Sequence, residues 1–179
     1  MDFKRMVQKM KKRILSIIGS MLILCSLMTA SVLNVKASDE EVKIVDGSRL
    51  TTDDSSTGYT SPKTRKYLMD GVSTISKAGR NRVYAYASTT ADIVVDYMAT
   101  IVYVEKYNKV GEEEFWDQVT WWMEKSENDN YMSTADSVTV DRGNYYRVRS
   151  NHIIGYTDEE TGEYVYEETF SYTDGILVP

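Results

Sequence analysis

The chain has a single histidine, His152, in the stretch GNYYRVRSNHII at residues 143–154. A serine nucleophile needs a base within hydrogen-bond reach, so a serine hydrolase with a histidine base would have to use this residue. The chain contains no G-x-S-x-G motif, and its pattern predicts no strand-to-helix turn to present such a serine. We therefore predict no catalytic residue and expect His152 to be a hydrogen-bonded structural side chain.

Alternation along the same stretch indicates a β-strand with two different faces. The face that we expect to point into the core holds Tyr146, Val148 and His152. Arg147 and Arg149 lie on the other face, which we expect to be exposed because arginine is mostly found at the surface. An acid on the neighbouring strand, such as Glu167, is the partner that we expect for these arginines.

Aromatic residues give the second candidate site, in FWDQVTWWMEK at residues 115–125. Strict alternation places Trp116 and Trp122 together on the more polar face of this strand. Exposed rings on a flat β-face can stack on sugar rings or on a partner surface, so these two residues form our tentative binding surface. The alternative is that the N-terminal segment, the other sheet or a neighbouring subunit covers both rings.

The acidic loops at residues 112–114 and 158–163 carry carboxylates of the kind that bind calcium. Neither loop has the alternating spacing of a dedicated calcium loop, so we expect solvated hairpin tips. No carboxylate pair lies in a recognisable glycosidase motif. We predict no metal site, no cofactor and no enzymatic activity, and a secreted hydrolase remains the less favoured alternative.

The N-terminus has the three regions of a secretory signal peptide. Six basic residues lie within residues 1–13, an apolar run follows at residues 14–28, and Val35-Lys36-Ala37 offers a small residue for cleavage. We predict a signal peptide over residues 1–37 with cleavage between Ala37 and Ser38. The apolar run is shorter than the roughly 20 residues that a spanning helix needs, so we expect no stable membrane span after its removal. The alternative is an uncleaved anchor.

Removal of residues 1–37 would leave a strongly acidic protein without cysteine. The remaining 142 residues contain 26 acidic and 14 basic side chains, a net charge of −12, and Cys25 lies in the removed segment. This charge argues against nucleic acids and anionic membranes as partners, because both attract basic segments. A secreted chain without disulfides depends on its core, which we expect to be rich in aromatic residues.

Two regions follow the predicted signal peptide. Residues 38–66 are polar, and we expect a flexible N-terminal segment. Residues 67–179 alternate between β-branched or aromatic runs and turn residues, and no helical period occurs there. We predict an all-β domain of seven or eight strands, an immunoglobulin- or fibronectin III-like sandwich, with a small β-barrel as the alternative.

Two resemblances add to this interpretation. The stretch VTVDRGNYYRVRSN resembles the E–F corner of fibronectin type III and immunoglobulin-like domains, which implies that Tyr146 and Val148 point inward from strand F. Over residues 46–176 the chain is similar to a family of small secreted proteins of Gram-positive bacteria that has no assigned function. The similar segments are DGSRLT, STGYTSPKTRKYLMDG, STISKAG, VYAYASTTA, VYVEKYN, NYYRVRSNH and YTDGI. This resemblance implies a signal peptide, secretion and a β-rich domain, and implies no activity.

These observations together predict a secreted, non-enzymatic binding or adhesion module that acts at the bacterial surface or in the medium. Its ligand would be an extracellular glycan or protein. A secreted effector or antibacterial factor is the main alternative, because composition and strand pattern do not distinguish the two.

Overall fold

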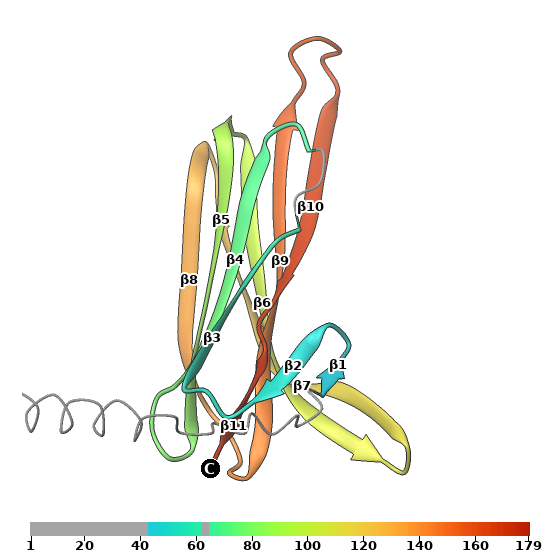
Figure 1. The fold of residues 1–179 in the computed structure, drawn as a ribbon. Helices are drawn as coiled ribbons and strands as arrows, with labels where there is room; N and C mark the ends of the chain where they lie inside the picture. Colours follow the sequence, from blue (N-terminus) through green and yellow to red (C-terminus); the bar gives the residue numbers. More distant parts are fainter. Residues whose placement is uncertain (1–42, 62–64) are drawn as a thin grey trace, which may run out of the picture. The chain divides into compact units, whose positions relative to one another are not determined.

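A computed structural model describes residues 43–61 and 65–179 of the chain (Figure 1). The predicted signal peptide and its cleavage site at Ala37 and Ser38 lie outside these residues. The described residues form eleven β-strands and no helix, so the all-β class predicted from the sequence is confirmed. No helix with the length and hydropathy to cross a membrane occurs within the described ranges.

The strands form two sheets. The smaller sheet has the order β3-β4-β5-β8 and is antiparallel throughout. Its members are β3 (Ser55–Tyr59), β4 (Leu68–Lys77), β5 (Arg82–Val95) and β8 (Asp129–Thr139). The larger sheet has the order β1-β2-β11-β9-β6-β7, and β10 also pairs with β9. Its members are β1 (Ile44–Val45), β2 (Ser48–Thr51), β6 (Tyr97–Val110), β7 (Glu113–Ser126), β9 (Asn144–Thr157), β10 (Tyr164–Tyr172) and β11 (Gly175–Val178).

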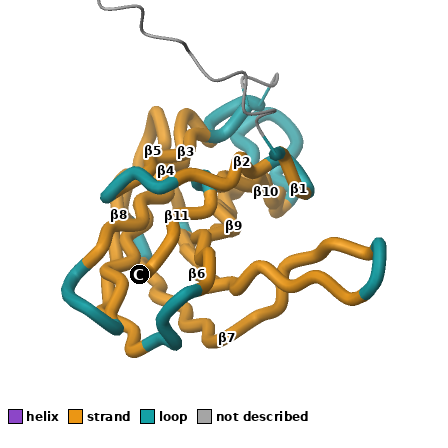
Figure 2. The backbone as a smooth tube through the Cα atoms, turned by 60° about the horizontal axis from the view of Figure 1, so that its bottom comes forward, coloured by secondary structure: helices purple, strands orange, loops and turns teal. Residues whose placement is uncertain are grey.

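The larger sheet bends where β10 passes into β11. Strand β10 pairs with one end of β9 and β11 with the other end, and Thr173 lies between them. The Thr173 N–H donates to the Val148 carbonyl at 3.0 Å, while its hydroxyl accepts from the Val148 N–H at 2.9 Å. The threonine side chain thus continues the backbone ladder through the bend. At the other side of the sheet, the tip of the β6–β7 hairpin extends beyond the remaining strands (Figure 2).

The predicted flexible segment over residues 38–66 is wrong for its described part, because residues 44–59 contain three strands. Strand β2 pairs in parallel with β11 of the larger sheet, and β3 pairs with β4 of the smaller one. The polar composition of this segment predicted flexibility, but backbone pairing and polar contacts, rather than apolar side chains, hold it on the two sheets. Ser48 is fully buried and donates to the Thr173 carbonyl at 2.7 Å, and Arg49 forms an ion pair with Asp174 at 3.0 Å.

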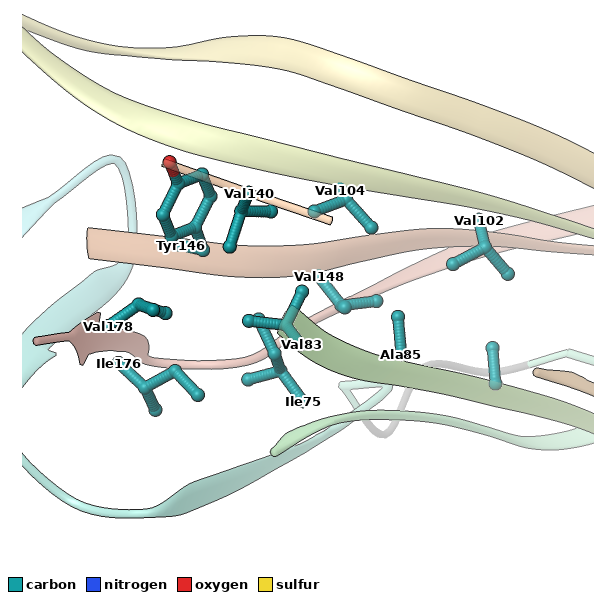
Figure 3. Packing of buried hydrophobic residues seen from close by; sticks show 11 residues of the cluster. Ile75, Val83, Ala85, Val102, Val104, Val140, Tyr146, Val148, Ile176 and Val178 are labelled. Atoms are coloured by element: carbon teal, nitrogen blue, oxygen red, sulfur yellow. The ribbon is translucent and has the colours of Figure 1, made fainter. Parts of the chain in front are cut away.

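The apolar core between the sheets has two clusters. The larger cluster lies near the end of β9 that pairs with β11 (Figure 3). Its members are Ile75, Val83, Ala85, Ala87, Val102, Val104, Val140, Tyr146, Val148, Ile176 and Val178. The smaller contains Leu68, Ala91, Val95, Met98, Met132, Ile154 and Tyr156. The predicted inward positions of Tyr146 and Val148 are confirmed. The expected aromatic-rich core is wrong, because each cluster has a single buried aromatic residue, Tyr146 or Tyr156, among aliphatic and methionine side chains.

Tyr146 also forms a specific turn contact. Its hydroxyl donates to the carbonyl oxygen of Asp141, five residues earlier, at 2.9 Å. This bond ties the turn between β8 and β9 to the first residues of β9. The ring itself is buried in the larger cluster, so the hydroxyl is the polar tip of a core aromatic residue.

We expect Tyr146→Phe to lower the free energy of unfolding by about 1 kcal/mol, the usual net contribution of one hydrogen bond. The ring and its packing stay, so the variant should remain folded. Urea unfolding followed by circular dichroism measures the change. Tyr84→Phe, at an exposed hydroxyl, is the matched control and should leave the midpoint unchanged. Equal effects of the two substitutions would contradict a structural role for the Tyr146 hydroxyl.

Candidate functional site

The two tryptophans of the predicted binding surface do not share a face. Strand β7 pairs with β6 in a register that skips Val119, which is therefore a β-bulge. One extra residue in a strand reverses the alternation beyond it. Trp116 and Trp122 lie on either side of this bulge, so they point to opposite sides of the sheet. The prediction that both form one exposed surface is wrong, because alternation was counted through a bulge that the sequence does not mark.

Trp122 packs on the core. It is half-buried against the larger apolar cluster, and its indole N–H donates to the Thr134 hydroxyl on β8 at 3.0 Å. Strands β7 and β8 are the outer strands of the two sheets on this side. The Trp122 side chain thus spans the space between them and stabilises the sandwich there.

Trp116 lies on the outer side of the larger sheet but is covered as well. Its indole N–H donates to the Val45 carbonyl at 2.9 Å, and its ring centroid lies 4.6 Å from the guanidinium carbon of Arg147. Trp116 therefore holds β1 against the sheet and forms one wall around a buried cation.

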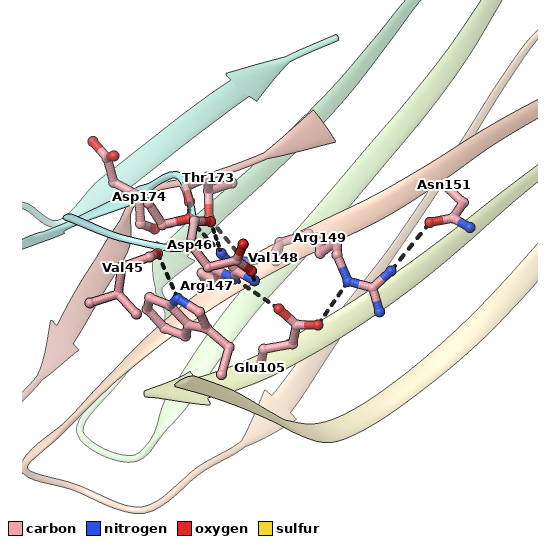
Figure 4. A network of polar contacts seen from close by, with 11 residues as sticks. Val45, Asp46, Glu105, Arg147, Val148, Arg149, Asn151, Thr173 and Asp174 are labelled. Atoms are coloured by element: carbon pink, nitrogen blue, oxygen red, sulfur yellow. Dashed lines mark hydrogen bonds and ion pairs between the residues drawn. The ribbon is translucent and has the colours of Figure 1, made fainter. Parts of the chain in front are cut away.

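Arg147 is that cation, and its predicted exposure is wrong, because only 2% of its side chain is accessible. The β1–β2 turn covers the guanidinium, which bonds to Glu105, Asp46 and Ser48 (Figure 4). The Nε donates to Glu105 at 2.8 Å, and one terminal nitrogen donates to the Asp46 carboxylate at 2.9 Å. Four of its five N–H groups have partners, so the buried charge is well satisfied.

Glu105 on β6, rather than the expected Glu167, is the acid that pairs with both arginines. Its two carboxylate oxygens accept from Arg147 Nε and Arg149 Nε, each at 2.8 Å. Arg149 is only partly covered, and its guanidinium carbon lies 3.9 Å from the centroid of the Tyr103 ring. One buried carboxylate therefore fixes both a covered and a partly exposed cation.

Glu167 lies on β10, opposite the buried Ile154 of β9, and has a different role. Its carboxylate accepts the backbone N–H groups of residues 66–68 and the Tyr156 hydroxyl. Burial opposes its ionisation, but these donors together hold the pKa of Glu167 below its ordinary value. Glu167 thereby secures the start of β4 against the larger sheet.

His152 is buried in a belt of polar side chains that separates the two apolar clusters. The belt consists of Ser73, Thr89, Thr100, Ser150, His152 and Ser171, all with 0% exposure. His152 Nδ1 lies 2.9 Å from the Thr89 hydroxyl, and Nε2 lies 2.8 Å from the Ser171 hydroxyl. A Cβ at Gly71 would lie 2.4 Å from the imidazole, so only glycine leaves room for the ring. The predicted inward, hydrogen-bonded position of His152 is confirmed.

The hydrogen bonds along the belt determine which nitrogen of His152 carries the proton. Ser73 donates to Ser150 at 2.7 Å, so Ser171 must donate to Ser73. Ser171 then accepts from His152 Nε2, which leaves Nδ1 to accept from Thr89. Burial, with a smaller contribution from the positive charge of Arg65, lowers the pKa of His152 to about 4. The imidazole is therefore neutral, enclosed and fully occupied, which is poor geometry for a catalytic base.

One group of exposed aromatic side chains lies on the outer side of β10, β9, β6 and β7, which we call the aromatic face. Its apolar members are Tyr97, Ile101, Tyr103, Trp121, Met123, Tyr166, Phe170 and Tyr172. Trp121 is 54% exposed and stacks on Tyr103 at a centroid distance of 6.4 Å, while Tyr166 is 65% exposed and packs edge-on against Tyr97. The sequence pattern missed Trp121, because the Val119 bulge turns it outward.

The outer side of the smaller sheet is chemically different, and we call it the hydroxyl face. Every described outward side chain in the central part of this sheet is uncharged. This part runs from Ser55 to Tyr59 on β3, Val72 to Ser76 on β4, Tyr84 to Thr90 on β5 and Tyr131 to Ser137 on β8. These residues are Ser55, Thr57, Tyr59, Val72, Thr74, Ser76, Tyr84, Tyr86, Ser88, Thr90, Tyr131, Ser133, Ala135 and Ser137. Neighbouring hydroxyls pair at Thr57–Thr74 (3.1 Å) and Tyr86–Tyr131 (3.0 Å). The alternating Ser, Thr and Tyr of these strands were the signal available in the sequence.

The acidic segments lie at or beside hairpin tips, and their carboxylates pair with lysines elsewhere in the chain, Glu114 with Lys43 and Asp158 with Lys66. In the loop at residues 158–163, Asp158 pairs with Lys66 at 2.7 Å and accepts two backbone N–H groups, which lowers the pKa of Asp158 to about 2. Within residues 43–61 and 65–179, no group of three or more Asp, Glu, His or Cys side chains has a geometry for holding a metal ion.

In comparisons with protein-family models, curated proteins and solved structures, none matched this chain. The function must therefore be inferred from the two outer faces and the contacts behind them.

We expect Glu105→Gln to lower the free energy of unfolding by about 3–5 kcal/mol, because it removes the buried one of the two carboxylates that pair with the buried Arg147 guanidinium. Chemical denaturation measures this loss. Glu114→Gln removes a carboxylate from the more exposed pair with Lys43 and should cost clearly less. Equal losses in the two variants would contradict the dominant role of the buried pair.

We expect stability to fall as the pH falls from 6.5 towards 4, through His152. The unfolded chain takes up this proton near pH 6.5 and the folded chain only near its lowered pKa of about 4, so the unfolded state binds more protons in between. The full shift corresponds to about 3 kcal/mol. NMR titration of the single imidazole reports the folded pKa directly, and unfolding between pH 7 and 5 tests the slope above the carboxylate range. A folded pKa near 6.5 would contradict the burial.

Proposed function

We propose that the protein is an exported, non-enzymatic binding module whose hydroxyl face binds a neutral extracellular glycan. The observation that carries this proposal is the lack of charge among the described residues of that face. The described part of the chain has 23 acidic and 13 basic side chains, so an uncharged area across four strands is a clear departure from its surroundings. A charged polymer would find no complementary groups on this face.

The chemistry of the face suits a polyhydroxylated ligand. Serine, threonine and tyrosine hydroxyls each donate one hydrogen bond and accept others, which matches the hydroxyl groups of a sugar. Tyr59, which is 67% exposed, Tyr84 and Tyr131 add ring faces against which the apolar side of a sugar ring can stack. Because the positions alternate along paired strands, the groups form a flat array suited to an extended chain rather than to a single enclosed sugar.

Several features favour binding over catalysis. Ser171 lies beside His152, but both side chains are fully buried and their hydrogen bonds are already used. Glu105 and Glu167, the well-covered carboxylates, are occupied by arginines and by backbone N–H groups, respectively. These groups are therefore engaged in holding the fold together.

We also infer a relation to the immunoglobulin and fibronectin type III sandwiches. The neighbours β4-β5-β8 correspond to strands A-B-E and β10-β9-β6-β7 to G-F-C-C′ of those folds. The Tyr146 hydroxyl bond to Asp141, at the start of the strand that would be F, resembles their tyrosine corner and supports this relation. Export at the surface of a Gram-positive bacterium, with the signal peptide at residues 1–37, belongs to the same proposal and fits the predicted disulfide-free, acidic domain.

We expect the purified protein to be retarded in native gels that contain a neutral polysaccharide, such as a β-glucan, a mannan or dextran. Tyr84→Ala and Tyr131→Ala should each weaken binding about tenfold, equivalent to roughly 1.4 kcal/mol for one lost stacking ring. Tyr166→Ala, which removes a tyrosine from the aromatic face that is even more exposed than Tyr84 and Tyr131, is the control and should bind like wild type.

Two results would overturn the proposal. One is the lack of retardation in every neutral polysaccharide, together with retention on an anionic polymer or on none. The other is loss of binding in Tyr166→Ala with no loss in Tyr84→Ala, which would transfer glycan binding to the other sheet.

A further inference from the structure

The aromatic face has the composition of a protein–protein interface rather than of a sugar platform. Tyrosine, tryptophan, phenylalanine, methionine and arginine are enriched in interface cores, and all five types occur on this face. Met123 and Phe170 are exposed there although their side chains have no group that forms strong hydrogen bonds with water. An exposed contiguous surface of this kind marks an interaction site on a soluble protein.

The rings and the cation on this face are ordered in advance. Arg149 is held by Glu105 and lies over Tyr103, and Tyr103 stacks on Trp121. Side chains that are already fixed lose little conformational entropy when a partner docks. The aromatic face is therefore prepared for a rigid contact.

Besides Arg149, the aromatic face carries a lysine and a glutamate at opposite ends of one row across the sheet. The register places Glu168 opposite Ile153, Ile153 opposite Ala99 and Ala99 opposite Lys125. Lys125 and Glu168 are both exposed, on β7 and β10 respectively. The row thus carries an acid at one edge, a base at the other and apolar residues between them.

We propose that a second copy of this chain docks on the aromatic face, related by a two-fold axis that runs along the strands between β6 and β9. Rotation about such an axis exchanges the two ends of every row. Lys125 then faces the partner's Glu168, and Glu168 faces the partner's Lys125, so the charge pattern complements itself twice. Self-complementarity of this kind is what an isologous two-fold interface requires.

The same rotation matches the apolar rows. Register places Tyr172, Arg149, Tyr103 and Trp121 in one row, so Trp121 meets the partner's Tyr172 and Arg149 meets the partner's Tyr103. In the next row, Met123 meets the partner's Phe170, a contact that suits the polarisable thioether. The pairs that form are thus aromatic, sulfur–aromatic and cation–ring contacts.

The test is a charge exchange measured by sedimentation velocity over a range of concentrations. The wild-type protein is expected to form a dimer, and Lys125→Glu or Glu168→Lys alone should weaken it at least about tenfold, since each creates like-charge pairs across the axis twice. The double variant Lys125→Glu/Glu168→Lys restores opposite charges and should dimerise like wild type. Arg80→Glu, in the β4–β5 turn, is the matched control and should not change the dimer.

Trp121→Ser provides a second measure, because the exposed indole is expected to be essential for the dimer and not for the fold. Circular dichroism and unfolding curves confirm that each variant remains folded. A protein that stays monomeric at all concentrations would overturn the proposal and leave the face to an unlike partner. Single charge variants that weaken the dimer without restoration in the double variant would overturn the two-fold arrangement. The dimer measurement is independent of the glycan proposal, since the hydroxyl face lies on the other sheet. A protein that binds no glycan can therefore still form the dimer.

Discussion

The burial of the Arg147 guanidinium is the constraint on which the larger sheet depends. A buried cation is costly unless carboxylates and other acceptors surround it, and here Glu105 comes from β6 and Asp46 from the β1–β2 turn. Trp116 of β7 and Tyr172 of β10 lie within 5.2 Å of the guanidinium, measured to their ring centroids. A single side chain on β9 therefore requires all these elements in place, and the polar N-terminal segment becomes part of the fold.

The same contact divides the outer side of the larger sheet into a covered and an open part. Around Arg147, the β1–β2 turn and Trp116 exclude solvent. Two residues further along β9, Arg149 bonds to Glu105 and lies over the Tyr103 ring. The open aromatic face begins at this row. The charge that fixes the N-terminal segment thus also orders the first row of the exposed face.

Much of this architecture could be predicted from alternation, and the failures have two physical causes. The all-β class and the inward positions of Tyr146, Val148 and His152 follow from local periodicity, which the structure retains in β9. The faces of the tryptophans were missed because the Val119 bulge changes the period within β7, and a bulge depends on pairing with β6 rather than on local sequence. The burial of Arg147 was missed because it depends on residues about 100 positions earlier in the chain.

The distribution of aromatic residues connects the core to the proposed functions. Among the described tyrosines only Tyr146 and Tyr156 are buried, while small side chains such as Ala85, Ala87 and Ser73 fill the space between the sheets. Most of the exposed large rings thus lie on the outer faces, where they are available for contact with other molecules. The two faces belong to different sheets, so pairing of two copies through the aromatic face would leave a hydroxyl face free on each. Under the two proposals, such a dimer would bind a long glycan at two points, and the second attachment would benefit from the high local concentration that the first creates. Two weak contacts of the kind expected of a flat, uncharged sugar site would then together hold the protein on the glycan.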